Sequence, residues 1–116
     1  MDISVTQRGI VNVLILKGKL DLVNAGMVKE TVKALLKDEK NQMHLNMREV
    51  DFINSSGLGA LVSIMKEIRV HKGRLTLSNL APYVNEIFEI TQLAHVFEIF
   101  REEEDAVRSY ETVATP

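Results

Sequence analysis

The chain has 116 residues, no cysteine, and a formal net charge of −2 from 14 basic and 16 acidic side chains. Hydrophobic residues make up 46% of it and charged residues 26%, which excludes disordered, collagen-like and coiled-coil classes. The lack of cysteine excludes disulfide frameworks, thiol catalysis and iron–sulfur clusters, and it fits a reducing compartment.

The length suits a single domain over residues 1–116, with a core at about residues 3–111 and a frayed end at 112–116. Basic residues are spread along the chain, so we expect no nucleic-acid binding. The first residues lack a secretory signal pattern, and the longest apolar stretch is far too short to span a membrane. We therefore expect a cytoplasmic domain that has no membrane contact.

The first part of the chain predicts a strand pair followed by a helix. Residues 3–5 alternate between apolar and polar, and after a turn at 7–9 the apolar run at 10–16 predicts a strand covered on both faces. We expect Gly18 to end that strand and Asn24 to cap the helix that follows. The apolar positions of this helix recur at helical spacing: Ala25, Val28, Val32, Leu35 and Leu36.

The rest of the chain alternates predicted strands with predicted helices. Alternating apolar residues predict strands at 43–48, 75–78 and 96–100, and a connecting loop is expected at 49–54. Helices are predicted to begin at Ser55, at Pro82 and at Glu102, the last with a solvated run of carboxylates in its first turn. The predicted core face of the Ser55 helix consists of Leu58, Leu61, Val62, Met65 and Ile68. This order implies an α/β fold whose sheet is mostly parallel after the opening hairpin.

Sites in such sheets lie where a strand's carboxyl end meets a helix N-terminus, and residues 18–24 and 54–59 meet that description. The second segment, Asn54-Ser55-Ser56-Gly57-Leu58-Gly59, is interpreted first as a serine N-cap with glycines for tight packing. A dinucleotide site is disfavoured because Val62 stands at the third small position of the fingerprint, and no P-loop lysine follows Gly59. Neither serine has the G-x-S-x-G frame of a hydrolase.

The titratable residues indicate no catalytic site. His44, His71 and His95 are interpreted as solvated or capping residues, and their spacing predicts no metal site. Asp21 is positioned either to cap the first helix or to project into the site, while Glu49 and Asp51 are expected on the connecting loop.

Three segments carry a resemblance to a known family. Residues 16–21, Leu-Lys-Gly-Lys-Leu-Asp, are similar to a G-x-[LI]-D element, and residues 45–59 resemble a signature that usually ends D-S-[ST]-G-L-G. Residues 80–93 resemble a helix that ends in a phenylalanine–acid–hydrophobic pattern. In this order the segments are similar to those of the STAS domains, and within them to the bacterial anti-sigma factor antagonists.

The resemblance implies a single small STAS-type domain with a mixed five-stranded sheet, helices mainly on one face, no cofactor and no enzymatic activity. It also implies a partner switch. The unmodified protein binds an anti-sigma factor that is itself a serine kinase, and so frees a sigma factor. Phosphorylation releases the antagonist, and a separate serine phosphatase restores it. We expect a monomer or a weak dimer.

Carried over by position, the resemblance implies that Ser55 is the phosphoacceptor. The partner-binding residues that it implies are Asp21, Asn54, Ser56, Gly57 and Leu58. Asn54 stands where the family most often has aspartate, which removes a charge beside the acceptor. Gln92 stands where close relatives often have glycine.

Two other functions stay open at this point. The chain could be a STAS module of another signalling or lipid-transport complex, in which Ser55 is never modified. It could also be a small phosphate- or nucleotide-binding protein that uses the helix after Ser55, since helix N-termini attract anions.

Overall fold

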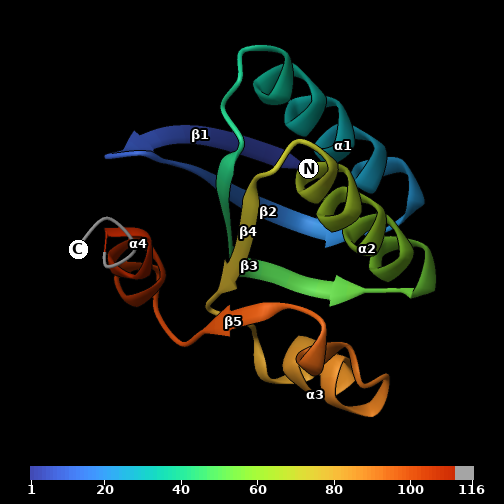
Figure 1. Ribbon diagram of the computed structural model, residues 1–116. Helices are drawn as coiled ribbons and strands as arrows, with labels where there is room; N and C mark the ends of the chain where they lie inside the picture. The colour runs from blue at the N-terminus through green and yellow to red at the C-terminus, as the bar shows by residue number, and fades with distance from the viewer. Residues whose placement is uncertain (112–116) are drawn as a thin grey trace.

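The computed structural model describes residues 1–111, and its five strands form one sheet in chain order, β1-β2-β3-β4-β5. β1 is antiparallel to β2, and each later strand is parallel to its neighbour, as the sequence predicts (Figure 1). The strands are β1 (Asp2–Arg8), β2 (Val11–Leu20), β3 (Gln42–Ile53), β4 (Arg74–Ser78) and β5 (Glu98–Phe100).

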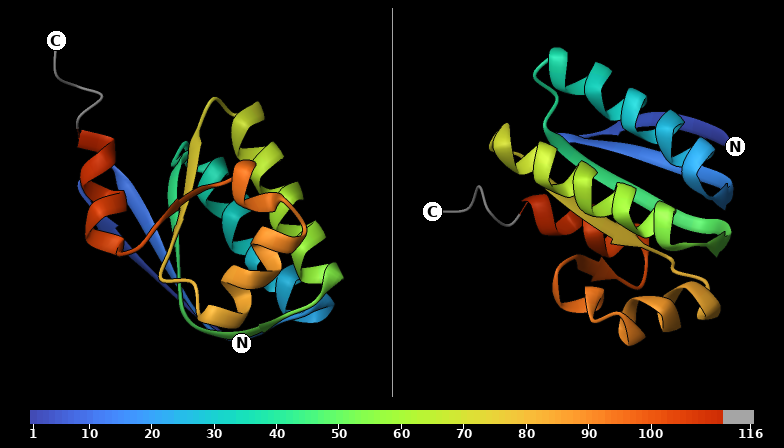
Figure 2. Two further views of the ribbon diagram at one scale, coloured as in Figure 1. Left: turned by 90° about the horizontal axis from the view of Figure 1, so that it is seen from below. Right: turned by 90° about the vertical axis from the view of Figure 1, so that its right-hand side faces the viewer.

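The helices lie mainly on one face of the sheet, which confirms the expected architecture. Figure 2 shows the last helix alone on one side of the sheet and the other helices on the opposite side. Those other helices are α1 (Leu22–Lys37), α2 (Ser55–Val70) and α3 (Pro82–Ile90), with a short 3-10 helix η1 (Leu93–His95) after α3. The helix on the opposite face is α4 (Glu103–Glu111).

The central strands are buried on both faces because a helix covers each. In β2, Leu14 and Leu16 belong to the main core beneath α1 and α2, while Val11 and Val13 pack with Tyr110 of α4 in a smaller cluster. The sequence prediction of a strand covered on both faces is confirmed. The predicted core positions of α1 and α2 are buried with two exceptions: Leu35 and Val62 are half-buried, and Ile64 is buried in addition.

Several predicted boundaries are wrong, and strand pairing explains those in β2 and β3. β2 continues through Gly18, whose φ of +128° suits glycine, and pairs with β3 up to Leu20. This pairing also extends β3 to Ile53, so Glu49 and Asp51 lie in a strand rather than in a loop. β5 is shorter than expected, because residues 96–97 follow η1 and precede the strand.

Gln92 adopts a left-handed backbone conformation between α3 and η1, with φ of +63°. Glycine reaches this conformation without strain, whereas a residue with a side chain adopts it at a cost. The predicted frayed end at 112–116 lies outside the described residues. Among residues 1–111, no helix combines the length and the apolar character needed to cross a membrane.

Candidate functional site

The candidate site lies at the edge of the sheet where β2 and β3 end and α1 and α2 begin (Figure 1). Leu20 and Ile53, the last residues of the two parallel strands, are paired with each other. Asp21 and Asn54 therefore follow neighbouring strand ends, as the general rule for parallel sheets predicts. The structure brings the two predicted site segments together at this corner.

Both helices begin with the same cap. Asp21 accepts a hydrogen bond from the backbone N–H of Asn24 at 3.0 Å, and Asn54 accepts one from the backbone N–H of Gly57 at 2.9 Å. The N-cap of α1 is thus not Asn24 but Asp21, for which capping was one of the two expected roles. The N-cap of α2 is Asn54, not a serine. Acidic and amide oxygens three residues before the bonded N–H are among the strongest N-caps.

Because Asn54 makes the N-cap of α2, neither serine serves as the cap. Ser55 and Ser56 occupy the first turn of α2, and both are exposed. The first turn of α2 holds no acidic residue. Because the N-terminus of a helix carries a partial positive charge, this exposed end can accommodate an added anion.

Gly57 holds α2 directly against the end of β2. A Cβ at Gly57 would lie 2.1 Å from the carbonyl oxygen of Leu20, a distance that real Cβ atoms do not show. Leu58 is only 8% exposed and belongs to the main core. Gly57 and Leu58 thus fix the position of the helix start, while the accessible side chains are those of Ser55 and Ser56.

An apolar surface and a groove adjoin the serines, and sequence reasoning missed both. Leu22 and Val23, at the start of α1, are 70% and 76% exposed. A groove between α1 and α2 opens beside them; its lining consists of Leu22, Ala25, Gly26, Lys29, Ser56, Gly59, Ala60 and Ser63. A Cβ at Gly26 or Gly59 would meet no atom within 4 Å, so neither glycine is needed for packing. Gly26 and Gly59 lie in the interior of helices, where glycine is unfavourable, and this sequence signal could have revealed the groove.

Comparison with known proteins agrees with this arrangement of strands, helices and capped helix starts. A family model described as the STAS domain matches residues 2–106. The chain belongs to the STAS domain family.

Among curated relatives, this STAS chain is 32% identical over 82 residues to the anti-sigma-B factor antagonist of Listeria monocytogenes, covering 71% of this chain and 72% of the relative. An anti-sigma factor antagonist from Mycobacterium paratuberculosis superposes with a TM-score of 0.82 at 20% identity, over 93% and 92% of the two chains. The Bacillus cell fate determinant SpoIIAA in its phosphorylated form gives a TM-score of 0.70 at 22% identity, over 93% and 99%. At these identities the two solved structures establish a shared fold.

The histidines of the STAS domain lie away from the serines. His44 is fully buried on the α4 side of β3, where its ring nitrogens hydrogen-bond to the hydroxyls of Thr76 and Ser78, each at 2.7 Å. Burial lowers the pKa of His44 to about 4, so the ring is neutral near pH 7. The interpretation of His44 as solvated or capping is therefore wrong. Within residues 1–111, no group of His, Cys, Asp or Glu is arranged to hold a metal ion.

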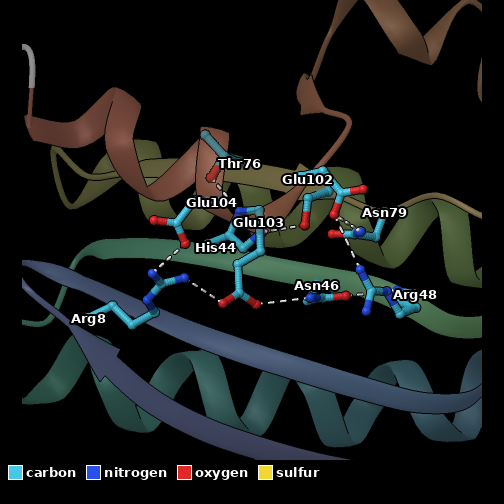
Figure 3. A network of polar contacts seen from close by, with 10 residues as sticks. Arg8, His44, Asn46, Arg48, Thr76, Asn79, Glu102, Glu103 and Glu104 are labelled. Carbon is cyan, nitrogen blue, oxygen red and sulfur yellow. Dashed lines mark hydrogen bonds and ion pairs between the residues drawn. The ribbon is translucent and has the colours of Figure 1, made fainter.

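Glu102, Glu104 and Asp105 at the start of α4 are exposed, as predicted, but the glutamates also form a network of polar contacts with the sheet (Figure 3). Arg8 of β1 binds Glu103 at 2.8 Å and Glu104 at 2.7 Å, and the pKa of Glu104 is lowered by this contact. Glu103 also accepts a hydrogen bond from Asn46 at 2.9 Å, and Glu102 pairs with Arg48. These contacts attach α4 to the sheet on the face opposite α1 and α2, so the network supports the fold and lies apart from the candidate site.

Proposed function

We propose that this STAS protein acts as an anti-sigma factor antagonist that is switched at Ser55. In the unphosphorylated state it binds an anti-sigma factor that is a serine kinase, and so frees a sigma factor. Phosphorylation of Ser55 by that kinase ends binding, and a serine phosphatase reverses it. The observation that carries the proposal is the exposed Ser55 hydroxyl at the first position of α2, in a cap made by Asn54 rather than by a serine.

The local structure is compatible with a phosphate that changes binding without unfolding the domain. Ser55 is exposed, and its helix start has no acidic side chain in the first turn. A phosphate adds about −1.5 to −2 charge near pH 7, which the helix dipole favours at this end. Asn54 makes the cap bond without the negative charge that an aspartate would bring, so the phosphate would meet less repulsion there.

The surroundings of Ser55 support a protein partner as the ligand. The exposed apolar side chains of Leu22 and Val23 flank the corner, and the α1–α2 groove opens beside Ser56. Asp21, Asn54 and Ser56 would then contact the partner directly. Gly57 and Leu58, both buried, would contribute by fixing the start of α2. A charge added at such an interface is unfavourable because binding removes water from it.

The proposal assigns no catalysis, cofactor or nucleic-acid binding to this chain, and it places the protein in the cytoplasm, where sigma factors act. The curated relative named an anti-sigma-B factor antagonist supports this regulatory function. It also takes residues 1–116 as one STAS domain.

The test is incubation with ATP and a candidate anti-sigma factor kinase from the same organism, followed by phosphopeptide mapping. Phosphate on Ser55, together with release of the kinase, is the expected result. Phosphate on Ser56 would contradict the assignment of Ser55 as the phosphoacceptor. No phosphate on either serine would favour a STAS module of another complex. A saturable rise in Tm with ATP or GTP alone would favour the nucleotide-binding alternative.

A further inference from the structure

The groove that opens beside Ser56 continues along the full length of the helix pair. Figure 2 shows α1 and α2 side by side on the same face of the sheet. Beyond the part lined by Ser56, a second hollow is lined by Lys29, Val32, Lys33, Ser63, Ile64 and Glu67. A third is lined by Lys33, Leu36, Lys37, Glu67 and His71. Because adjoining hollows share lining residues, they form one groove, which we call the α1–α2 groove.

One wall of the α1–α2 groove carries a row of lysines. Lys29, Lys33 and Lys37 recur every four residues along α1, so they point to the same side of the helix over about 12 Å of its axis. Within residues 1–111, none of the three forms an ion pair. Like charges at this spacing destabilise a helix, so the row is unfavourable in the isolated domain.

The opposite wall does not neutralise the row. The charged side chain that α2 contributes to the groove is Glu67, whose nearest ion-pair contact is with His71 at 4.0 Å. The floor is apolar and formed by buried side chains such as Val32, Leu36 and Ile64. An apolar floor with one cationic wall complements an amphipathic segment that presents carboxylates on one side.

We propose that the α1–α2 groove binds an acidic helical segment of the protein partner, with its carboxylates facing Lys29, Lys33 and Lys37. A helix suits the site because carboxylates placed every four residues have the same spacing as the lysine row. The inference deepens the proposed function in that it takes the groove and the Ser55 corner as one docking surface. A phosphate on Ser55 then adds negative charge at the mouth of the groove and repels the same segment.

The test uses a 16-residue helical peptide with leucines on one side and glutamates at every fourth position beside them. Its binding is followed by amide chemical shifts of the full chain at low and high salt. We expect shifts confined to residues lining the α1–α2 groove, with affinity that falls as salt rises. A peptide with lysine in place of glutamate serves as the control and is expected to bind at least tenfold more weakly.

Two triple variants with equal net charge distinguish peptide binding in the α1–α2 groove from non-specific electrostatic attraction to the protein. Lys29→Gln, Lys33→Gln and Lys37→Gln together are expected to weaken peptide binding about tenfold, since each substitution removes one exposed ion pair and a single exposed pair contributes only modestly. Lys40→Gln, Lys66→Gln and Lys72→Gln remove the same charge from exposed positions outside the lining of the groove and are expected to leave binding unchanged. Equal loss in both, or no binding by the wild type, would overturn the groove assignment.

Failure of the groove assignment can be distinguished from failure of the proposed Ser55 switch. If the kinase partner phosphorylates Ser55 but binds the Lys29, Lys33 and Lys37 variant as tightly as wild type, the groove assignment fails and the switch stands. If the acidic peptide binds as described while no partner modifies Ser55, the groove assignment stands and the switch fails.

Discussion

Gly57 and Leu20 approach so closely that the contact leaves no room for a side chain. A Cβ on Gly57 would lie 2.1 Å from the carbonyl oxygen of Leu20 and 2.9 Å from its carbonyl carbon. The end of β2 and the start of α2 are thereby held together through backbone, which also sets Asp21 beside the serines of α2. Backbone cannot give way as a flexible side chain does, so substitution here requires the helix start to move.

We therefore expect Gly57→Ala to lower the free energy of unfolding by about 1–3 kcal/mol, the usual range for overpacking. The matched control is Gly59→Ala in the same helix, where an added Cβ meets nothing within 4 Å. That variant is expected to gain about 0.5–1 kcal/mol, because alanine favours the helix over glycine. Urea denaturation measures both. Equal stability of the two variants would show that Gly57 is not under steric constraint.

A second prediction concerns His44 and acid stability. The pKa of His44 is lowered from the ordinary 6.5 to about 4; burial is the largest cause, Glu103 opposes the shift, and Arg8 adds to it. Between these two pH values the unfolded chain takes up a proton that the folded chain does not. Stability should therefore fall as the pH drops from 6.5 to 4, by about 3 kcal/mol from this residue alone.

The measurement is the free energy of unfolding in urea at several pH values between 4 and 7. His44→Gln removes the titration while keeping hydrogen-bonding groups near Thr76 and Ser78. Its stability should depend less steeply on pH than that of the wild type, and the difference between the curves isolates His44 from the carboxylates. Parallel curves would contradict the assignment of a neutral buried ring.

Local sequence patterns predicted most of the fold because they report on one helix or strand at a time. Alternation in β4 and helical spacing in α1 and α2 identified these elements and most of their buried residues. The same logic misread His44, which alternates with apolar residues in β3 as a solvent-facing residue would. It is buried because α4 covers that face, and α4 is attached through contacts such as Arg8 with Glu103, 95 residues apart. No local pattern reports a contact of that range.

The sequence predicted where the candidate site lies, but it did not predict the cap residue of α2 or the α1–α2 groove. Parallel strands followed by helices placed residues 18–24 and 54–59 at one edge, where the structure has them. The cap was assigned to a serine because serine, asparagine and aspartate are almost equally good N-caps. Backbone geometry decides between adjacent candidates, and here it selects Asn54. The α1–α2 groove depends on how two helices pack, which spacing within one helix does not determine.

A third prediction concerns Gly26, which lies in the interior of α1 and lines the groove beside Ser56. Gly26→Leu should stabilise the domain by about 0.5–1 kcal/mol, because leucine favours a helix over glycine and a Cβ at this position meets no atom within 4 Å. The same side chain occupies the groove, so we expect binding of the kinase partner to weaken at least tenfold. Thermal unfolding and titration calorimetry measure the two effects. Unchanged affinity would mean that the partner does not enter this part of the groove.

The last prediction separates folding from binding at Ser55. A negative charge at the start of α2 is favoured by about 0.3–1 kcal/mol, so Ser55→Asp should melt close to the wild type. An unpaired charge at a desolvated interface is unfavourable by about 3–5 kcal/mol, and this effect is the larger one. The affinity of Ser55→Asp for the kinase partner should therefore fall by roughly two to three orders of magnitude.

Ser55→Ala supplies the opposite outcome, because it keeps the surface neutral and cannot be phosphorylated. It should bind the kinase persistently in the presence of ATP, whereas the wild type should dissociate as phosphate accumulates. Ser56→Ala is the matched control, since its hydroxyl is equally exposed and one position away; it should still be released by ATP. Release of Ser55→Ala by ATP would show that the switch acts at another residue.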